Sequence, residues 1–292
     1  MGRFLNALVL SLPIFVVASV GCQLAPTKVS ESFRPEYGEM VSKTSQPIVF
    51  TEKTVVLDTR SAFDFGLSRI QDSRLFSWEN LAESRDQGYL LTDLRKVSQR
   101  LALNGLDIHT PVIVVAGNPA SPGAGRLAWS LLYYGFYDVQ VANIDLFKNR
   151  MTNRAADPVK NVDPKEVQPR AHLEVLKPEF EQLLKNADDR KEKRIFIIDV
   201  RSEKEFAAAK RSDLLWLEWK EFYHSKGPNE GRPNSKVIRR LAELGVQPSD
   251  RIVPVSNKGE RSGAAAFSLI ALGFAKVQNF TGGWSSLNKG SR

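Results

Sequence analysis

Cysteine is almost missing from this sequence, since Cys22 is the only one among 292 residues. A chain with one thiol has no intramolecular disulfide and no metal cluster of several thiolates. Histidine is scarce as well, and His109, His172 and His224 are far apart along the chain. We therefore expect no metal site and no cofactor.

Blocks of charge of one sign are also lacking. The formal net charge is +8, but the 41 basic residues are interspersed with 33 acidic ones. A dispersed basic excess is weak support for nucleic acid or an anionic surface as a partner. We expect no nucleic-acid partner, and the 42% hydrophobic content is typical of a globular protein.

Long apolar runs are confined to one segment, residues 4–20, which follows Arg3. This run is marginal for a membrane span and suits a signal peptide. The small residues before Cys22 resemble the lipobox of bacterial lipoproteins, in which the thiol is acylated. The resemblance implies a signal peptide at residues 1–21, a lipidated N-terminus and tether at residues 22–44, and domains held at a membrane of the bacterial envelope, outside the cytoplasm. An ordinary secretory signal with an incidental cysteine, or a plain membrane anchor, is the alternative.

One sequence pattern occurs twice along the chain. Residues 55–65 read VVLDTRSAFDF and residues 196–206 read FIIDVRSEKEF, and the offset between these two segments also relates Trp78 to Trp219. Two later matches follow in the same order, at slightly shorter offsets. Four ordered matches indicate a tandem duplication.

Each half alternates apolar, β-branched runs with one alanine-rich segment. The runs predict strands at residues 54–57, 112–115, 195–198 and 252–255. Helices are predicted at residues 126–134 and 262–272, and each is followed by a glycine suited to a helix C-terminus, Gly135 and Gly273. Strands that alternate with helices predict an α/β fold with parallel sheets flanked by helices on both faces.

The second half resembles a known family. Residues 252–262 read IVPVSNKGERS and precede the alanine-rich helix, a Gly-Phe pair and the triplet at residues 282–284, GGW. Together with the Asp-x-Arg strand end, this resembles the rhodanese family of sulfurtransferases. The resemblance implies two rhodanese-like domains, each a five-stranded parallel sheet flanked by helices. We place domain 1 at residues 45–150, a linker at 151–171 and domain 2 at 172–292.

The loop after the strand at residues 252–255 departs from the family at one position. In the family this loop reads Cys-x-x-Gly-x-Arg, whereas here it reads Ser256, Asn257, Lys258, Gly259, Glu260 and Arg261, followed by Ser262. Sulfur transfer needs a thiolate that carries sulfur as a persulfide, and a serine hydroxyl is essentially un-ionised at neutral pH. We therefore predict no catalytic residue in this loop.

The corresponding loop of the first half departs further. The repeat places Ala116 at the family's cysteine position and Gly123 opposite Arg261. This loop lacks both the nucleophile and the cation. The resemblance implies a degenerate structural domain.

Two groups of residues remain candidates for a site. Backbone N–H groups at a helix start, together with the side chains of residues 256–262, predict a site for sulfate, thiosulfate, phosphate or carboxylate. The alternative is that Arg261 only braces the loop while Lys258 is solvated. Four charged residues at strand ends are assigned by the resemblance to a structural network rather than to catalysis: Asp58, Arg60, Asp199 and Arg201.

These features favour a non-catalytic binding, scaffolding or anion-sensing module at the cell envelope, a pseudoenzyme of the sulfurtransferase type. The expected partners are a membrane, through the lipid anchor, a small anion and an envelope protein that the sequence does not identify. The alternative is a sulfurtransferase-family enzyme, similar to thiosulfate sulfurtransferases, with a degenerate active site. A serine hydrolase is disfavoured because no Gly-x-Ser-x-Gly elbow surrounds Ser256.

Overall fold

The computed structural model describes residues 48, 50–84, 87–117, 121–154, 158–159, 162–209, 211–226 and 229–287. The predicted signal peptide, Cys22 and the predicted tether lie outside these residues. Within them, none of the helices combines the length and the apolar character needed to cross a membrane.

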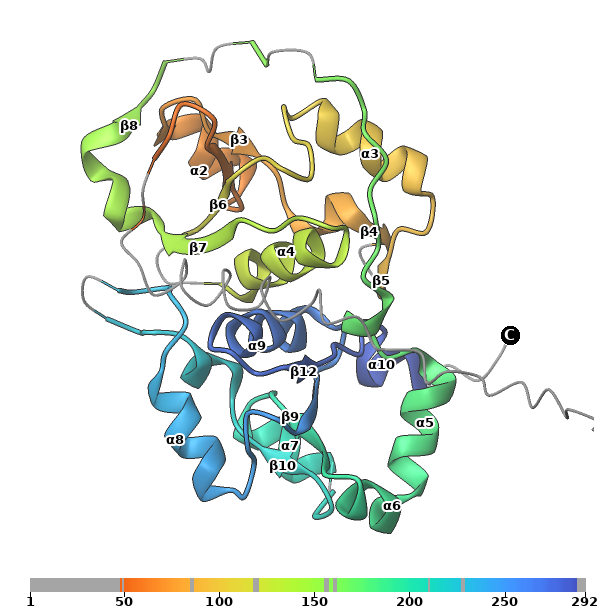
Figure 1. Ribbon diagram of the computed structural model, residues 1–292. Helices are drawn as coiled ribbons and strands as arrows, with labels where there is room; N and C mark the ends of the chain where they lie inside the picture. The colour runs from red at the N-terminus through yellow and green to blue at the C-terminus, as the bar shows by residue number, and fades with distance from the viewer. Residues whose placement is uncertain are drawn as a thin grey trace, which may run out of the picture.

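A four-stranded parallel sheet in the order β3-β1-β6-β7 organises the first half of the described chain (Figure 1). Its strands are β1 (Val55–Asp58), β3 (Arg74–Leu75), β6 (Val112–Ala116) and β7 (Val139–Asn143). The helices of this half are α2 (Ala62–Leu67), α3 (Leu94–Ala102), α4 (Pro122–Tyr133) and the 3-10 helices η1 (Trp78–Leu81) and η2 (Ile144–Arg150). Two short antiparallel pairs accompany the sheet, β2 (Arg69–Ile70) with β8 (Met151–Thr152) and β4 (Ala82–Ser84) with β5 (Gln87–Leu90).

The second half repeats this strand order in a second parallel sheet, β10-β9-β11-β12. Its strands are β9 (Ile195–Asp199), β10 (Leu215–Trp216), β11 (Arg251–Val255) and β12 (Lys276–Val277). Its helices are α5 (Lys177–Lys185), α6 (Ala187–Glu192), α7 (Glu203–Ala209), α8 (Lys236–Glu243), α9 (Glu260–Ala271), α10 (Gly283–Leu287) and the 3-10 helices η3 (Ala171–Leu173) and η4 (Trp219–Phe222).

The predicted α/β class and the parallel sheets flanked by helices are confirmed. The predicted strands at residues 54–57, 112–115, 195–198 and 252–255 correspond within one residue to β1, β6, β9 and β11. Each sheet has four strands within the described residues, whereas five were predicted. Helix α4 begins at Pro122, before its predicted start at residue 126, because proline has the backbone angle of a first helical turn.

The predicted glycine ends of the two long helices are confirmed. Gly135 and Gly273 adopt φ angles of 105° and 93°, in the left-handed region that glycine enters without a Cβ penalty. After α4, the Phe136 N–H donates to the carbonyl of Leu131 and the Gly135 N–H to that of Leu132, both at 3.1 Å. These two bonds satisfy carbonyls at the helix end in a Schellman motif.

Among the described residues the hydrophobic core has three parts, one between the sheets and one on the far face of each. Helices α4 and α9 pack against each other between the two sheets (Figure 1), and one apolar cluster runs through both. Trp129 of α4 and Phe267 of α9 are almost fully buried there. The outer cluster of the first sheet includes Phe147, and that of the second includes Phe180. Both sheets are therefore covered on both faces, as parallel sheets require.

Glycines bring α4 and α9 close together at two equivalent points. A Cβ at Gly125 would lie 2.8 Å from the Cβ of Ala264, and a Cβ at Gly263 would lie 2.5 Å from the Cδ of Arg126. Gly125 and Gly263 occupy equivalent positions of the sequence repeat, as do Arg126 and Ala264. The helix contact thus has local two-fold symmetry.

The segment predicted as a linker is bound to the first half where the structure describes it. The Arg170 guanidinium donates to the carbonyls of Leu132 and Phe136, both at 2.7 Å. Val167 is buried, and its N–H donates to the hydroxyl of Ser98 at 3.3 Å. Helices α3 and α4 therefore hold residues 167–170 in place.

Candidate functional site

The loop between β11 and α9 is closed by its own polar atoms. Ser256, the first residue after β11, is only 1% exposed. Its Oγ accepts a hydrogen bond from the Ser262 N–H at 3.2 Å and lies 3.2 Å from the Ser262 Oγ. Gly259 has a φ of 72°, and a Cβ there would overlap the carbonyl of Thr281. The chain turns into α9 in a conformation and a space that only glycine fits without strain.

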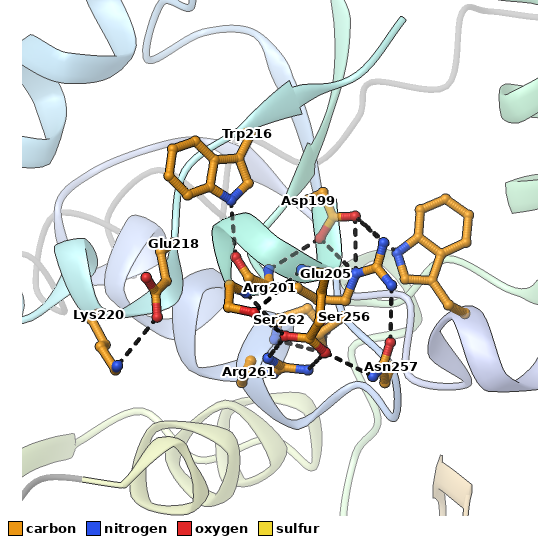
Figure 2. A network of polar contacts seen from close by, with 12 residues as sticks. Asp199, Arg201, Glu205, Trp216, Glu218, Lys220, Ser256, Asn257, Arg261 and Ser262 are labelled. Carbon is orange, nitrogen blue, oxygen red and sulfur yellow. Dashed lines mark hydrogen bonds and ion pairs between the residues drawn. The ribbon is translucent and has the colours of Figure 1, made fainter. Parts of the chain in front are cut away.

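A carboxylate from another element occupies the cationic side of this loop. Figure 2 shows Glu205, from α7, between Arg261 and Asn257. The Arg261 guanidinium donates to the two carboxylate oxygens at 2.7 and 2.8 Å, and the Asn257 Nδ2 donates to one of them at 3.0 Å. Ser202 adds bonds from its hydroxyl at 2.7 Å and from its N–H at 3.1 Å.

These bonds fix the charge of both partners. The hydrogen bonds from Arg261, followed by those from Ser202, hold the pKa of Glu205 well below its usual range. The hydrogen bond to Glu205 raises the pKa of Arg261 in turn. The loop therefore already binds a carboxylate, supplied by its own chain.

At the strand ends, an arginine pairs with an aspartate in each half. Arg201 forms a fork with the fully buried Asp199, with its Nη2 at 2.7 Å from Oδ2, and Arg60 does the same with Asp58. In the second half the network reaches the loop, because Arg201 Nη1 donates to the Asn257 Oδ1 at 3.2 Å (Figure 2). The Asp–Arg pair thus orients the Asn257 amide, which in turn contacts Glu205.

The loop after β6 in the first half differs in composition from the loop after β11. Ala116 is the last residue of β6 and is buried, so this strand end carries no polar side chain. Gly123, in the first turn of α4, faces the second half, where a Cβ would lie 3.4 Å from the Oε1 of Glu260. The Glu260 side chain therefore reaches α4, whereas the Arg261 side chain turns to Glu205 on α7.

The first half also covers the loop of the second half. A Cβ on Gly88, in β5, would overlap the carbonyl oxygen of Lys258 and would lie 2.5 Å from that of Thr281. The Gly88 carbonyl accepts a bond from Arg126 Nη2 at 2.6 Å. Strand β5 therefore lies directly on the backbone of the loop, and Arg126 holds it there.

Arg126 is a fully buried cation between the two halves. Its guanidinium lies 4.7 Å from the ring centre of Trp129 and 5.8 Å from that of Trp78. Burial lowers its pKa to about 10. Burial also raises the pKa values of the carboxyl groups of Glu174 and Glu260, whose charges interact with Arg126. Among the described residues, its Nε and Nη1 have no hydrogen-bond partner.

Comparison with known proteins identifies the second half. The family model described as the rhodanese-like domain matches residues 179–289. A rhodanese-like domain is present in this chain. It contains α7, β9, β11 and α9, so the loop at Ser256 and the carboxylate of Glu205 both belong to it. No curated protein matches the chain.

Solved structures of the protein EanB resemble the fold beyond the rhodanese-like domain. Its complex with hercynine has a TM-score of 0.68 at 16% identity, covering 86% of this chain and 66% of that one. The wild-type structure gives 0.67 at 15%, covering 86% and 65%. A persulfide intermediate with ergothioneine gives 0.65 at 16%, covering 86% and 66%. The chain thus spans slightly less than two thirds of EanB, and this similarity concerns the fold.

The structure separates the residues of the predicted anion site. Within the rhodanese-like domain, Asn257 and Arg261 converge on Glu205, whereas Lys258 is exposed. Sequence reasoning missed Glu205 as a member of the site. The sequence did carry a signal, because Ser202 and Glu205 have the Ser-x-x-Glu spacing of a helix capping box.

Proposed function

We propose that this chain is a non-catalytic binding protein of the cell envelope, built from two rhodanese-like domains and held at a membrane by a lipidated Cys22. The strand order shared by the two sheets and the sequence repeat support the assignment of a rhodanese-like domain to the first half of the chain as well. The lipobox-like residues before Cys22 support the anchor.

The observation that carries the non-catalytic role is the state of Ser256. This residue opens the loop of the rhodanese-like domain, is buried, and has its hydroxyl bonded within the loop. No other position after residue 22 holds a cysteine. Because a persulfide needs a thiolate, sulfur has no carrier in this loop. The carboxylate of Glu205, paired with Arg261, holds a negative charge at the place where a thiosulfate would have to approach this arginine.

A sulfurtransferase is the second candidate. The fold similarity to EanB, whose structures include a persulfide intermediate with ergothioneine, favours it. It requires a sulfur carrier other than Ser256, or a small-molecule thiol that accepts sulfur directly within the protein.

A thiosulfate and cyanide assay separates the two candidates. We expect no thiocyanate from the unmodified chain above the buffer rate. Turnover by the unmodified chain would contradict the non-catalytic role and support the second candidate. Ser256→Cys tests whether only the thiol is missing, and Ala116→Cys is its matched control, since it places a buried thiol at the equivalent strand end of the first half.

The anchor is tested independently of the assay. We expect the chain recovered from bacterial membranes to begin at Cys22 and to carry the mass of attached acyl groups. Cys22→Ser is the control and should yield no acylated product. A mature N-terminus at another residue, without acyl mass, would contradict the anchor and leave the sulfur-transfer result unaffected.

A further inference from the structure

Helix α2 exposes large apolar side chains that the fold does not require. None of its residues is buried, and Phe63 and Leu67 are 73% and 61% exposed. The equivalent helix of the second half, α7, has Lys204 and Ala208 at the corresponding positions of the sequence repeat. Because α7 has the same place in the repeat and lacks these large apolar side chains, the fold itself does not need them. Their presence on α2 points to contact with another surface.

Cations lie on the segments next to α2. Arg69 follows the helix, and its guanidinium lies 5.1 Å from the ring centre of Phe65. It also donates from Nε to the carbonyl of Arg154 at 2.9 Å, which places the exposed Arg154 next to the end of α2. Lys148 and Arg150 are exposed on η2, and both η2 and α2 contact β2.

The two helices of this surface carry one carboxylate each, Asp64 on α2 and Asp145 on η2. Asp64 accepts a bond from the Ser61 hydroxyl at 2.6 Å. Asp145 lies 3.6 Å from the Lys148 ammonium. Four cations, Arg69, Lys148, Arg150 and Arg154, stand against these two carboxylates. The surface around α2 thus combines exposed apolar groups with an excess of positive charge, the combination that binds anionic bilayers.

The N-terminal part of the chain joins the molecule next to this surface. The Phe50 ring packs edge-on against Phe147 with ring centres 5.4 Å apart, and the Arg150 guanidinium lies 4.1 Å above Phe50. Residues 147–150 belong to η2, beside β2 and α2. A membrane tether that precedes residue 48 would thus bring this side of the molecule to the bilayer.

We infer that the α2 patch, defined as Phe63, Leu67, Arg69, Lys148, Arg150 and Arg154, docks on the anionic lipid headgroups of the membrane. The inference rests on the proposed membrane location, but not on acylation of Cys22. The apolar side chains enter the interface between headgroups and acyl chains, and the cations pair with lipid phosphates.

Vesicle binding by the unacylated chain tests this inference apart from the anchor. A chain that starts at residue 23 keeps every core cluster of the described residues. It is sedimented with vesicles of phosphatidylcholine alone or mixed with phosphatidylglycerol. The patch variant Phe63→Ser/Leu67→Ser is compared with Leu103→Ser/Leu176→Ser, which removes apolar residues that are equally exposed, at 75% and 63%, on other elements.

We expect the unmodified chain to bind the anionic vesicles, the patch variant to bind about tenfold more weakly, and the control variant to bind like the unmodified chain. Absence of binding by the unmodified chain, or equal losses in both variants, would overturn the inference. So would a dimer that forms without lipid and is lost only in the patch variant, because the patch would then bind a second copy. An unacylated Cys22 in the membrane extract would overturn the anchor and not this surface.

Discussion

Replacing Glu205 by glutamine keeps the shape of the side chain and removes the charge that the loop binds. The carboxylate accepts two bonds from Arg261 and one from Asn257. The side chains of Glu205 and Arg261 are 31% and 23% exposed, so solvent weakens the pair. Charge-assisted bonds in this setting contribute on the order of 2 kcal/mol together. We expect Glu205→Gln to lower the free energy of unfolding by about that amount at pH 7, and the melting temperature by roughly 4–8 °C.

The pH dependence identifies the charge as the cause. Because the pKa of Glu205 is lowered in the folded protein, its stabilisation is complete above the pKa of an unfolded glutamate, about 4.3, and is lost as the pH falls through the folded pKa. The difference between the unmodified chain and the variant should therefore be constant near neutrality and shrink in acid.

Urea denaturation followed by tryptophan fluorescence measures this difference at each pH. Glu203→Gln is the control, because Glu203 is an exposed residue of the same helix. A Glu205→Gln variant as stable as the unmodified chain at pH 7 would refute the role of Glu205. A loss of stability that stays the same in acid would refute its electrostatic origin.

Three further predictions concern the loop between β11 and α9 and strand β5, which lies on it. Gly88→Ala should destabilise the protein by about 1–3 kcal/mol in urea, because its Cβ overlaps the Lys258 carbonyl, whereas Gly66→Ala, in open space on α2, should not destabilise it. Burial raises the pKa of Glu260, so the folded protein loses stability as the pH rises and this carboxyl group ionises. Glu260→Gln should therefore raise the free energy of unfolding at pH 7, and this gain should disappear in acid. An unchanged urea midpoint at pH 7 would contradict this expectation. Because Glu205 already occupies the Arg261 guanidinium, thiosulfate, sulfate or phosphate should shift the melting temperatures of the unmodified chain and of Arg261→Ala equally, and a larger shift of the unmodified chain would support the predicted anion site.

The central strands and the long helices were predictable because their signals are local. A buried parallel strand such as β11 appears in the sequence as a continuous apolar run, and Gly273 marks the end of α9. The edge strands β3, β10 and β12 have two residues each. Two residues have no periodicity, so the sequence could not place these strands.

The composition of the loop was predictable, but its partners were not. The serine at residue 256 and the Asp–Arg spacing are visible along the chain. Glu205 meets Arg261 across 56 residues, and Gly88 meets Lys258 across a still longer separation. Such contacts depend on how sheets and helices pack, which no local pattern encodes.

The pairing of Gly125 with Ala264 and of Gly263 with Arg126 has the geometry of an isologous dimer within a single polypeptide. In such a contact each surface is complementary to its own duplicate. A protein with only one of these units would carry, on its alanine-rich helix, the face needed to associate with another molecule of the same kind. When two units are joined on one chain, the two contacting helices are free to differ in sequence. Here α4 carries the buried Arg126 where α9 carries Ala264.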